Sequence, residues 1–361
     1  MAKKLAFDRV LFTAVVLLVG LGLVMVYSAS TPMVRAQGRA LNPFLLKQVI
    51  AATVGFAGMA LVMHLDYRRL RDPRVIYTLL GGVVVLLVAV LFGPELNSTR
   101  RWLFFAGVSI QPSELAKLAL IPFLAYQIDR KLELVNSREL LLPVAATTGL
   151  LSGLIVLQPD LGTAVLLITS AAVLLFLAGL SWRFLAAAGA LAAPLLWFLV
   201  ISVPYRRARL FAFLDPEKDP LGSGFQALQS LIAVGSGGVL GLGPGESVQK
   251  LYFLPYPHSD FIFAIVAEEL GLLGGLAVVG LFALLLWRGV RAGLRAPDPF
   301  GRFLGWGFAV LLALQAFLNI SVAIALVPTK GIPLPFLSYG GSSLVASLIA
   351  CGVLLNVSQH G

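Results

Sequence analysis

Ten long, almost uninterrupted apolar runs constrain this chain more than any other feature of its sequence. They lie near residues 8–28, 44–64, 74–92, 113–130, 141–157, 161–180, 184–203, 261–287, 303–327 and 342–356. A helix needs about 20 mostly apolar residues to cross the hydrocarbon core of a bilayer. The runs are continuous and lack the period-two alternation of a membrane β-barrel. The sequence therefore predicts an all-α integral membrane protein with about ten transmembrane helices.

Charged residues are too scarce to cover a soluble protein of this size. They make up 12% of the 361 residues, and apolar residues make up 59%, whereas an average soluble domain is roughly 25% charged. This composition excludes an ordinary soluble enzyme and a disordered chain, and the single Cys351 excludes a disulfide scaffold. The net charge of +10 does not indicate nucleic-acid binding, because Lys and Arg are spread over the short segments between apolar runs.

The distribution of Lys and Arg predicts that both termini are cytoplasmic. With the N-terminus inside, the inner segments carry 15 Lys and Arg and the short outer loops carry six, as the positive-inside rule requires. The first run has no small-residue cleavage site after it, so we expect an uncleaved first span. Residues 204–260 then form a large extracytoplasmic loop between helices 7 and 8, within a single membrane domain spanning 1–361. Basic and apolar residues alternate at the start of this loop, which is typical of an interfacial helix.

Asp260 is the most informative ionisable residue, because it stands where the long loop enters the eighth span. A carboxyl group partly desolvated by Phe261 and Phe263 can have a raised pKa and act as a general base. His258, two residues earlier, could titrate nearby. Ser259 and Asp260 are also favoured helix N-caps, so a capping role is the alternative.

Other polar groups allow both a structural and a functional interpretation. Glu114 and Lys117 are three residues apart on one helix face, either as a buried ion pair or as groups that orient a substrate. Arg101 and Trp102 suit a phosphate or a sugar, or they anchor the chain at the membrane interface. Asp160 follows a proline and is expected to cap the sixth span.

The segment from Pro328 to Ser343 contains three prolines and cannot continue as a helix. Irregular backbone at membrane depth must line a polar cavity or be buried in protein, and Asn319 in the ninth span faces the same demand. These features together predict a polar cavity that opens outward and carries one carboxylate with excess basic residues. Such a cavity fits an enzyme acting on a lipid-linked phosphate, and it also fits a transporter.

Several short motifs are spread over essentially the whole chain. They are Val24–Ser30, Arg101–Trp102, Gln111–Lys117, Gln158–Thr163, Leu254–Phe263, Glu268–Gly271 and Pro328–Ser343. In these motifs the chain resembles the SEDS family (shape, elongation, division and sporulation), the FtsW/RodA/SpoVE membrane proteins of bacterial cell-wall synthesis. Gly243–Leu251 looks like the FtsW branch, whereas Ile332–Phe336 is more like RodA. Tyr256-Pro257 departs from the family pattern, which has a carboxylate there.

The resemblance implies a peptidoglycan glycosyltransferase that polymerises lipid II through β-1,4 bonds at the outer face of the cytoplasmic membrane, for cell division or for elongation and shape. Asp260 matches the family's essential aspartate and would be the general base. Arg101 and Lys117 would hold the anionic pyrophosphates. The other substrate-binding residues would be Trp102, Gln111, Glu114, His258 and Ser338.

The resemblance also implies a class B penicillin-binding protein as partner, together with other proteins of the division or elongation complex. A divalent cation could share the pyrophosphate charge, but no carboxylate cluster in the sequence defines a metal site. Two other functions stay open: a lipid II flippase and a scaffold that only recruits the penicillin-binding protein. A flippase needs polar groups along a full pathway, whereas the unusual polar residues here concentrate at the outer edge, which favours the enzyme.

Overall fold

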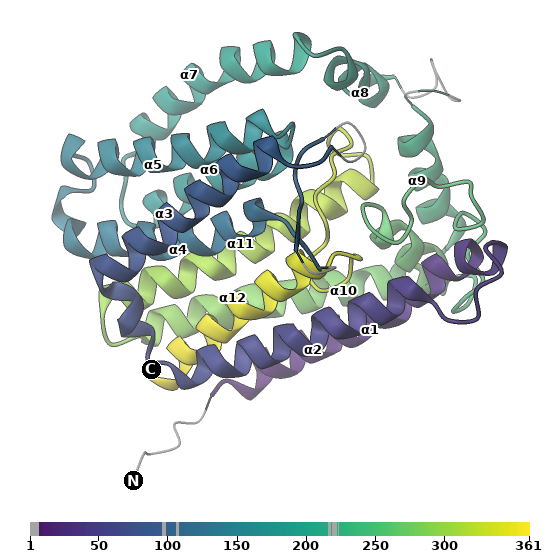
Figure 1. Ribbon diagram of the computed structural model, residues 1–361, viewed down its shortest axis with the longest axis horizontal. Helices are drawn as coiled ribbons and strands as arrows, with labels where there is room; N and C mark the ends of the chain where they lie inside the picture. The colour runs from purple at the N-terminus through teal and green to yellow at the C-terminus, as the bar shows by residue number, and fades with distance from the viewer. Residues whose placement is uncertain (1–6, 96–98, 106–107, 216–217, 219–221, 223) are drawn as a thin grey trace.

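The computed structural model describes residues 7–95, 99–105, 108–215, 218, 222 and 224–361 (Figure 1). Lys3 and Lys4, which count toward a cytoplasmic N-terminus, lie outside these residues, as do short stretches of the segment 204–260. The elements are α1 (Arg9–Ala36), α2 (Pro43–His64), η1 (Tyr67–Arg71), α3 (Pro73–Ala89), η2 (Val90–Phe92), β1 (Leu103–Phe105), β2 (Val108–Ile110), α4 (Pro112–Arg130), η3 (Leu132–Leu134), α5 (Arg138–Leu157), α6 (Leu161–Leu177), α7 (Trp182–Ile201), α8 (Pro204–Leu214), α9 (Phe225–Ser236), α10 (Ile262–Arg295), α11 (Pro299–Ala323) and α12 (Gly341–Gln359).

Each of the ten predicted spans is a helix in the structure. Within the described residues, eight helices are long and apolar enough to cross a membrane: α1, α2, α3, α5, α7, α10, α11 and α12. The other two are α6, an apolar helix of 17 residues, and α4, which carries the Glu114–Lys117 pair. The segment 204–260 contains two further helices, α8 and α9, as its amphipathic pattern predicts. The protein is therefore an all-helical membrane protein, and the part of the chain that the structure describes departs from helix and loop only in the short antiparallel β1–β2 hairpin.

Local sequence signals set where many of the helices begin. Asn42 precedes Pro43, and the Asn42 side chain accepts hydrogen bonds from two first-turn N–H groups at 3.0 and 3.1 Å. Asp298 precedes Pro299 and accepts one such bond at 2.8 Å. Asn and Asp satisfy donors that the helix leaves free, and proline fits the first helical position because its missing N–H is not needed there.

Small residues let the central helices approach closely. A Cβ on Gly289 of α10 would lie 2.6 Å from the Cβ of Ala309 of α11. A Cβ on Gly352 of α12 would lie 2.9 Å from the carbonyl oxygen of Met59 of α2. Van der Waals contact between small residues holds membrane helices together, because lipid gives no hydrophobic drive for helix association.

The helices pack around α4, α11 and α12, which are largely buried (Figure 1). In contrast, α7 has no buried residue and runs along the edge of the bundle together with α8. Helix α1 begins and α12 ends at the same end of the bundle. The β1–β2 hairpin is at the other end of α12, where the Gln111 N–H donates to Ser342 Oγ at 3.2 Å. This end also carries the last loop, residues 324–340, and with it the candidate site.

Candidate active site

Asp260 stands immediately before α10 and does not cap it. The helix begins at Ile262, its N-cap is Phe261, and no side chain caps the first turn. The alternative that Ser259 or Asp260 is a helix cap is therefore wrong. The last loop packs against the carboxyl group, since a Cβ on Gly331 would lie 3.4 Å from Asp260 Oδ2. This carboxyl group is thus partly enclosed by backbone without being used to start the helix.

The surroundings of Asp260 raise the pKa of its carboxyl group, as a general base requires. Burial raises the pKa of Asp260 to about 6, and nearby Asp160 adds to this rise. The guanidinium groups of Arg209 and Arg101 oppose the rise. Burial also lowers the pKa of Lys330, which precedes Gly331 in the last loop. Asp260 is therefore ionised at neutral pH but more basic than an ordinary aspartate.

Amide side chains from the helices hold the last loop in place. Asn319 of α11 donates to the carbonyl oxygens of Asp260 at 2.9 Å and Ile332 at 2.8 Å. Gln315 of α11 donates to the Pro333 carbonyl oxygen at 2.9 Å. The Asn319 amide nitrogen thus finds two partners, whereas its Oδ1 is buried without a hydrogen-bond partner among the described residues. The loop is buried in protein over much of its length.

Gln48 of α2 anchors the end of the same loop. It donates to the Ser338 carbonyl oxygen at 3.0 Å and accepts from the Gly340 N–H at 3.2 Å. Ser338 itself accepts from the Leu334 N–H at 2.8 Å and donates to the Ser259 carbonyl oxygen at 2.6 Å. Ser338 is buried and thus joins the last loop to the residue before Asp260.

Arg101 connects the β1–β2 region to the start of α6. Its Nε donates to the Gln158 carbonyl oxygen at 3.0 Å, and its Nη2 donates to that of Pro159. Asp160 caps α6, as predicted, and accepts from the Thr163 N–H at 3.2 Å. Arg101 is half-buried, and its charge acts on Asp260. The structure therefore brings Arg101 and Asp260 together.

Glu114 and Lys117 form the buried ion pair that was one of their two interpretations. Lys117 Nζ lies 2.6 Å from Glu114 Oε2 and donates to Gln315 Oε1 at 2.7 Å. Because Gln315 in turn holds the Pro333 carbonyl, the pair lies behind the last loop and supports it. Both side chains are buried, with 4% of Lys117 and 2% of Glu114 exposed.

His258 lies in an aromatic cluster next to Asp260. Its ring centroid is 4.8 Å from that of Phe44 and 5.6 Å from that of Tyr339. Burial lowers the pKa of His258 to about 4, so the imidazole is neutral at pH 7. The His258 carbonyl oxygen accepts a hydrogen bond from the Tyr339 N–H at 2.8 Å. This bond joins the segment just before Asp260 to the last loop.

Trp102 and Gln111 flank the β1–β2 hairpin. Trp102 is half-buried beside Arg101. Gln111 is the N-cap of α4 but makes no side-chain capping bond. The Gln111 backbone N–H donates to Ser342 Oγ and so joins the hairpin to the N-terminus of α12. A substrate-binding role for Trp102 and Gln111 stays a prediction.

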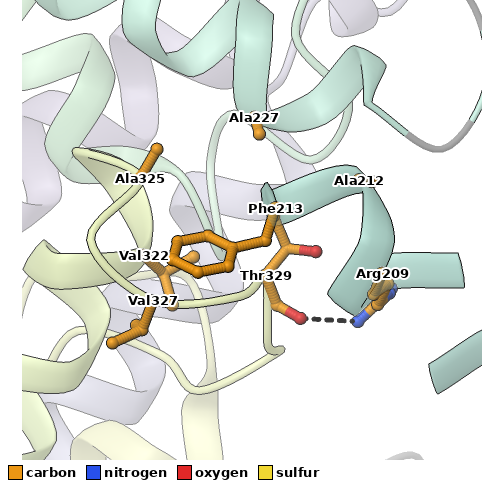
Figure 2. A pocket seen from close by; sticks show the side chains of 8 residues that line it. All are labelled: Arg209, Ala212, Phe213, Ala227, Val322, Ala325, Val327 and Thr329. Carbon is orange, nitrogen blue, oxygen red and sulfur yellow. Dashed lines mark hydrogen bonds between the residues drawn. The ribbon is translucent and has the colours of Figure 1, made fainter. Parts of the chain in front are cut away.

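Sequence reasoning did not nominate Arg209, which the structure places at this site (Figure 2). Arg209 belongs to α8, and its Nη1 donates to the Thr329 carbonyl oxygen of the last loop at 3.3 Å. Phe213 of α8 and Val327 of the loop line the small hollow beside this bond. The alternation of basic and apolar residues in α8 indicated an interfacial helix, but only the fold reveals that the charge of one of its arginines lowers the pKa of Asp260.

Among the described residues, no three or more His, Cys, Asp or Glu side chains group as metal ligands. Asp160 is the described carboxylate whose charge raises the pKa of Asp260. A divalent cation would therefore need most of its ligands from substrate phosphates and water, which is common for Mg²⁺.

Comparison with known proteins assigns the family. Residues 8–361 match the FtsW/RodA/SpoVE family model, described as cell cycle protein. The chain is 44% identical over 357 residues to the probable peptidoglycan glycosyltransferase FtsW of Geobacter metallireducens, covering 98% of this chain and 95% of the relative. It is 41% identical over 360 residues to stage V sporulation protein E of Bacillus subtilis, covering 99% and 98%.

Solved structures agree with this assignment. A chain from a peptidoglycan synthase complex superposes with a TM-score of 0.81 at 36% identity, covering 98% of both chains. The rod shape determining protein RodA of Thermus thermophilus gives a TM-score of 0.71 at 32% identity, covering 98% of this chain and 97% of RodA. On the match of its whole length in sequence and of its helical architecture, the chain belongs to the FtsW/RodA/SpoVE family of membrane proteins.

Proposed function

We propose that this protein is a peptidoglycan glycosyltransferase of the FtsW type, which polymerises lipid II at the outer face of the bacterial cytoplasmic membrane. The observation that carries the proposal is the carboxyl group of Asp260. It is free of a capping role, enclosed by the last loop, raised in pKa to about 6 and faced by two guanidinium groups. The relatives named as probable peptidoglycan glycosyltransferases supply the reaction class.

The reaction is the one that the family resemblance implies, and the charges at the site support it. Asp260 takes the proton from the 4-hydroxyl of the incoming lipid II, and that oxygen attacks the anomeric carbon of the growing chain with inversion. The bond between the anomeric carbon and the diphosphate oxygen breaks, and the diphosphate leaves with the bonding electron pair. Arg209 and Arg101 lie where positive charge would stabilise the departing diphosphate.

This function requires the site to face outward, with both termini in the cytoplasm. The excess of Lys and Arg in the opposite loops supports that orientation. Helix α1 begins and α12 ends at the same end of the bundle, which is consistent with termini on one side. Labelling of single cysteines with a membrane-impermeant maleimide tests it: Arg39→Cys, at an exposed position in the loop after α1, should react from outside, and Arg68→Cys should not.

We further infer a class B penicillin-binding protein as partner, together with other division or elongation proteins. The similarity to a chain from a peptidoglycan synthase complex supports this partner. Co-purification with the cognate transpeptidase tests the partner, and localisation to midcell or to the side wall tests the role in division or elongation.

The decisive experiment supplies lipid II to the purified complex in detergent, where there are no leaflets to cross. Wild-type protein should form glycan polymer, and Asp260→Asn should form none while remaining folded. Asp72→Asn is the matched control, because Asp72 is an exposed cap of α3 at the other end of the bundle. Absence of polymer from a folded wild-type complex, together with lipid II movement in liposomes, would instead establish a flippase. Full cell viability with Asp260→Ala would indicate a scaffold.

A further inference from the structure

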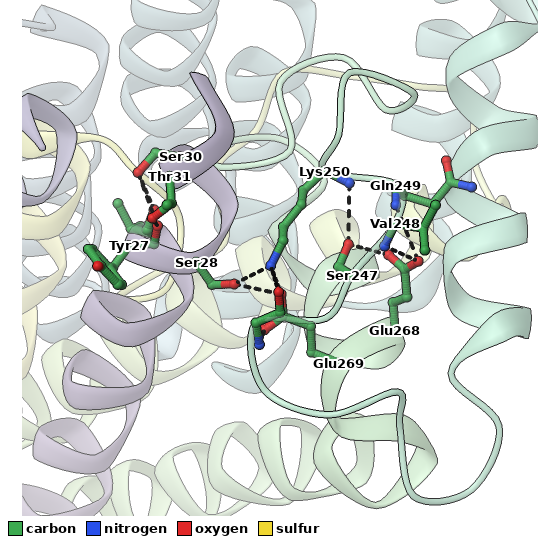
Figure 3. Close-up of polar contacts among 12 residues, drawn as sticks. Tyr27, Ser28, Ser30, Thr31, Ser247, Val248, Gln249, Lys250, Glu268 and Glu269 are labelled. Atoms are coloured by element: carbon green, nitrogen blue, oxygen red, sulfur yellow. Dashed lines mark hydrogen bonds and ion pairs between the residues drawn. The ribbon is translucent and has the colours of Figure 1, made fainter. Parts of the chain in front are cut away.

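A second buried polar cluster lies apart from the carboxyl group of Asp260, where the segment 245–250 meets α1 and α10 (Figure 3). Lys250 Nζ lies 2.8 Å from Glu269 Oε1 and 2.9 Å from Ser28 Oγ. Ser28 Oγ donates in turn to Glu269 Oε1 at 2.6 Å. All three side chains are buried. A single ion pair thus joins three segments that are far apart in the sequence.

The neighbouring carboxylate binds the same segment from the other side. Glu268 Oε1 accepts from the N–H groups of residues 248–249 at 3.0 and 3.3 Å, and the Ser247 hydroxyl donates to Glu268 Oε2. Glu269 Oε2 accepts from the Gly245 N–H at 2.9 Å. Two adjacent carboxylates of α10 therefore fix the whole segment 245–250 (Figure 3).

A kink in α10 makes room for this arrangement. Gly271 has a φ of 68° and interrupts the helix, which frees carbonyl groups before it. The N–H groups of Leu242 and Gly243 donate to the carbonyl oxygens of Glu268 and Glu269, each at 3.0 Å. Backbone hydrogen bonds therefore join residues 242–243 to the kinked part of α10.

The ion pair also closes a loop of chain around the proposed catalytic carboxylate. Lys250 and Glu269 are 19 residues apart, and Asp260 lies midway between them. We propose that the Lys250–Glu269 pair locks the segment carrying Asp260 in its reactive position, with Lys250 acting as a positioning residue. This inference rests on the proposed function, since it assigns a role in the same reaction.

Stability alone does not explain such a pair. A buried ion pair contributes little net stability compared with an apolar pair of similar volume, because both charges lose their hydration. Any arrangement that separates the two charges leaves both uncompensated, so the pair selects one relative placement of α1, the segment 245–250 and α10. A small misplacement of a catalytic group is enough to lower the rate strongly.

Two variants test the lock in the complete protein with its partner. Lys250→Met leaves the Glu269 carboxylate without its counter-ion, and it should lower kcat about 10- to 100-fold with little change in the KM for lipid II. The double variant Lys250→Met/Glu269→Gln removes both charges and should regain thermal stability. The double variant should nevertheless keep a low kcat, because the neutral side chains do not lock the segment.

The pH profile separates positioning from stability. Release of the segment lets water reach Asp260, so the acid limb of kcat in the double variant should move from about pH 6 to lower pH. The charged groups that face Asp260 are Arg209 of α8, Arg101 before β1 and Asp160 of α6, and neither variant removes them. Lys47→Met, at an exposed lysine of α2, is the matched control and should behave as wild type.

The outcomes are distinguishable. A folded double variant with wild-type kcat and an unmoved acid limb overturns the lock, provided that Asp260→Asn is inactive. Full activity of Asp260→Asn overturns the proposed function and the lock together. Ser28→Ala gives a graded check, because it keeps the ion pair, removes the two hydrogen bonds of the Ser28 hydroxyl and should lower kcat by a smaller factor than Lys250→Met.

Discussion

The acid limb of the polymerisation rate should report the ionisation of Asp260. The pKa of this carboxyl group is raised from 3.8 to about 6, which corresponds to about 3 kcal/mol of differential interaction between its two protonation states. A base must be ionised to accept a proton, so activity is present above the pKa and is lost as the pH falls through it. With a pKa of about 6, roughly nine-tenths of the protein is ionised at pH 7 and roughly one-tenth at pH 5, a tenfold loss of rate.

Two substitutions should move this limb in opposite directions. Arg209→Gln removes a cation that holds the pKa of Asp260 down, so the limb should move to higher pH. Asp160→Asn removes an anion that raises this pKa, so the limb should move to lower pH. The Asn side chain retains an oxygen that can accept from the Thr163 N–H, which preserves the cap of α6.

The assay is kcat for lipid II polymerisation by the purified complex in detergent, measured between about pH 4.5 and 8.5. Thermal unfolding recorded at each pH excludes denaturation as the cause of an acid limb. A wild-type midpoint near 4 would contradict the enclosed carboxyl group. Shifts of the same sign in Arg209→Gln and Asp160→Asn would refute the electrostatic account of the site.

Three further substitutions test buried contacts in different parts of the bundle, each by thermal unfolding in detergent. Lys117→Met leaves Glu114 buried without its counter-ion and should cost about 3–5 kcal/mol, most of which Glu114→Gln in the same chain should restore. Gly241→Ala should cost at least ~1–3 kcal/mol, because φ is +83° and the new Cβ would lie 2.2 Å from the Glu269 carbonyl oxygen. Asn356→Leu should cost about 2–4 kcal/mol, because this buried amide bonds four backbone groups around the end of α2. A wild-type melting temperature would contradict the corresponding contact.

The helices could be predicted from the sequence because a bilayer demands long apolar runs, and all ten runs are helical. Local signals were also sufficient for Asp160, whose preceding proline and cap chemistry determine its role. The role of Asp260 was harder to predict, because Ser259 and Asp260 have the composition of a cap. Only the observed start of α10 separates a cap from a free carboxyl group.

Contacts between distant segments could not be predicted from local pattern. Lys117 forms a hydrogen bond with Gln315, which is 198 residues away in the sequence. Lys250 forms one with Ser28, which is 222 residues away. The kink at Gly271 was not predicted, because a glycine shortly after two glutamates does not by itself show that a helix is interrupted there. The role of Arg209 could not be predicted for a similar reason. Its neighbours in the sequence predict an interfacial helix, and its position at the site depends on the contact between α8 and the last loop.

The amide anchors of the last loop have an evolutionary consequence. Gln48, Gln315 and Asn319 bind main-chain atoms of this loop, and main-chain atoms are the same whatever side chains the loop carries. Descendant sequences can therefore exchange the less buried side chains of this loop without losing these main-chain anchors. Buried side chains such as Leu334, Phe336 and Ser338 stay constrained by their packing and hydrogen bonds.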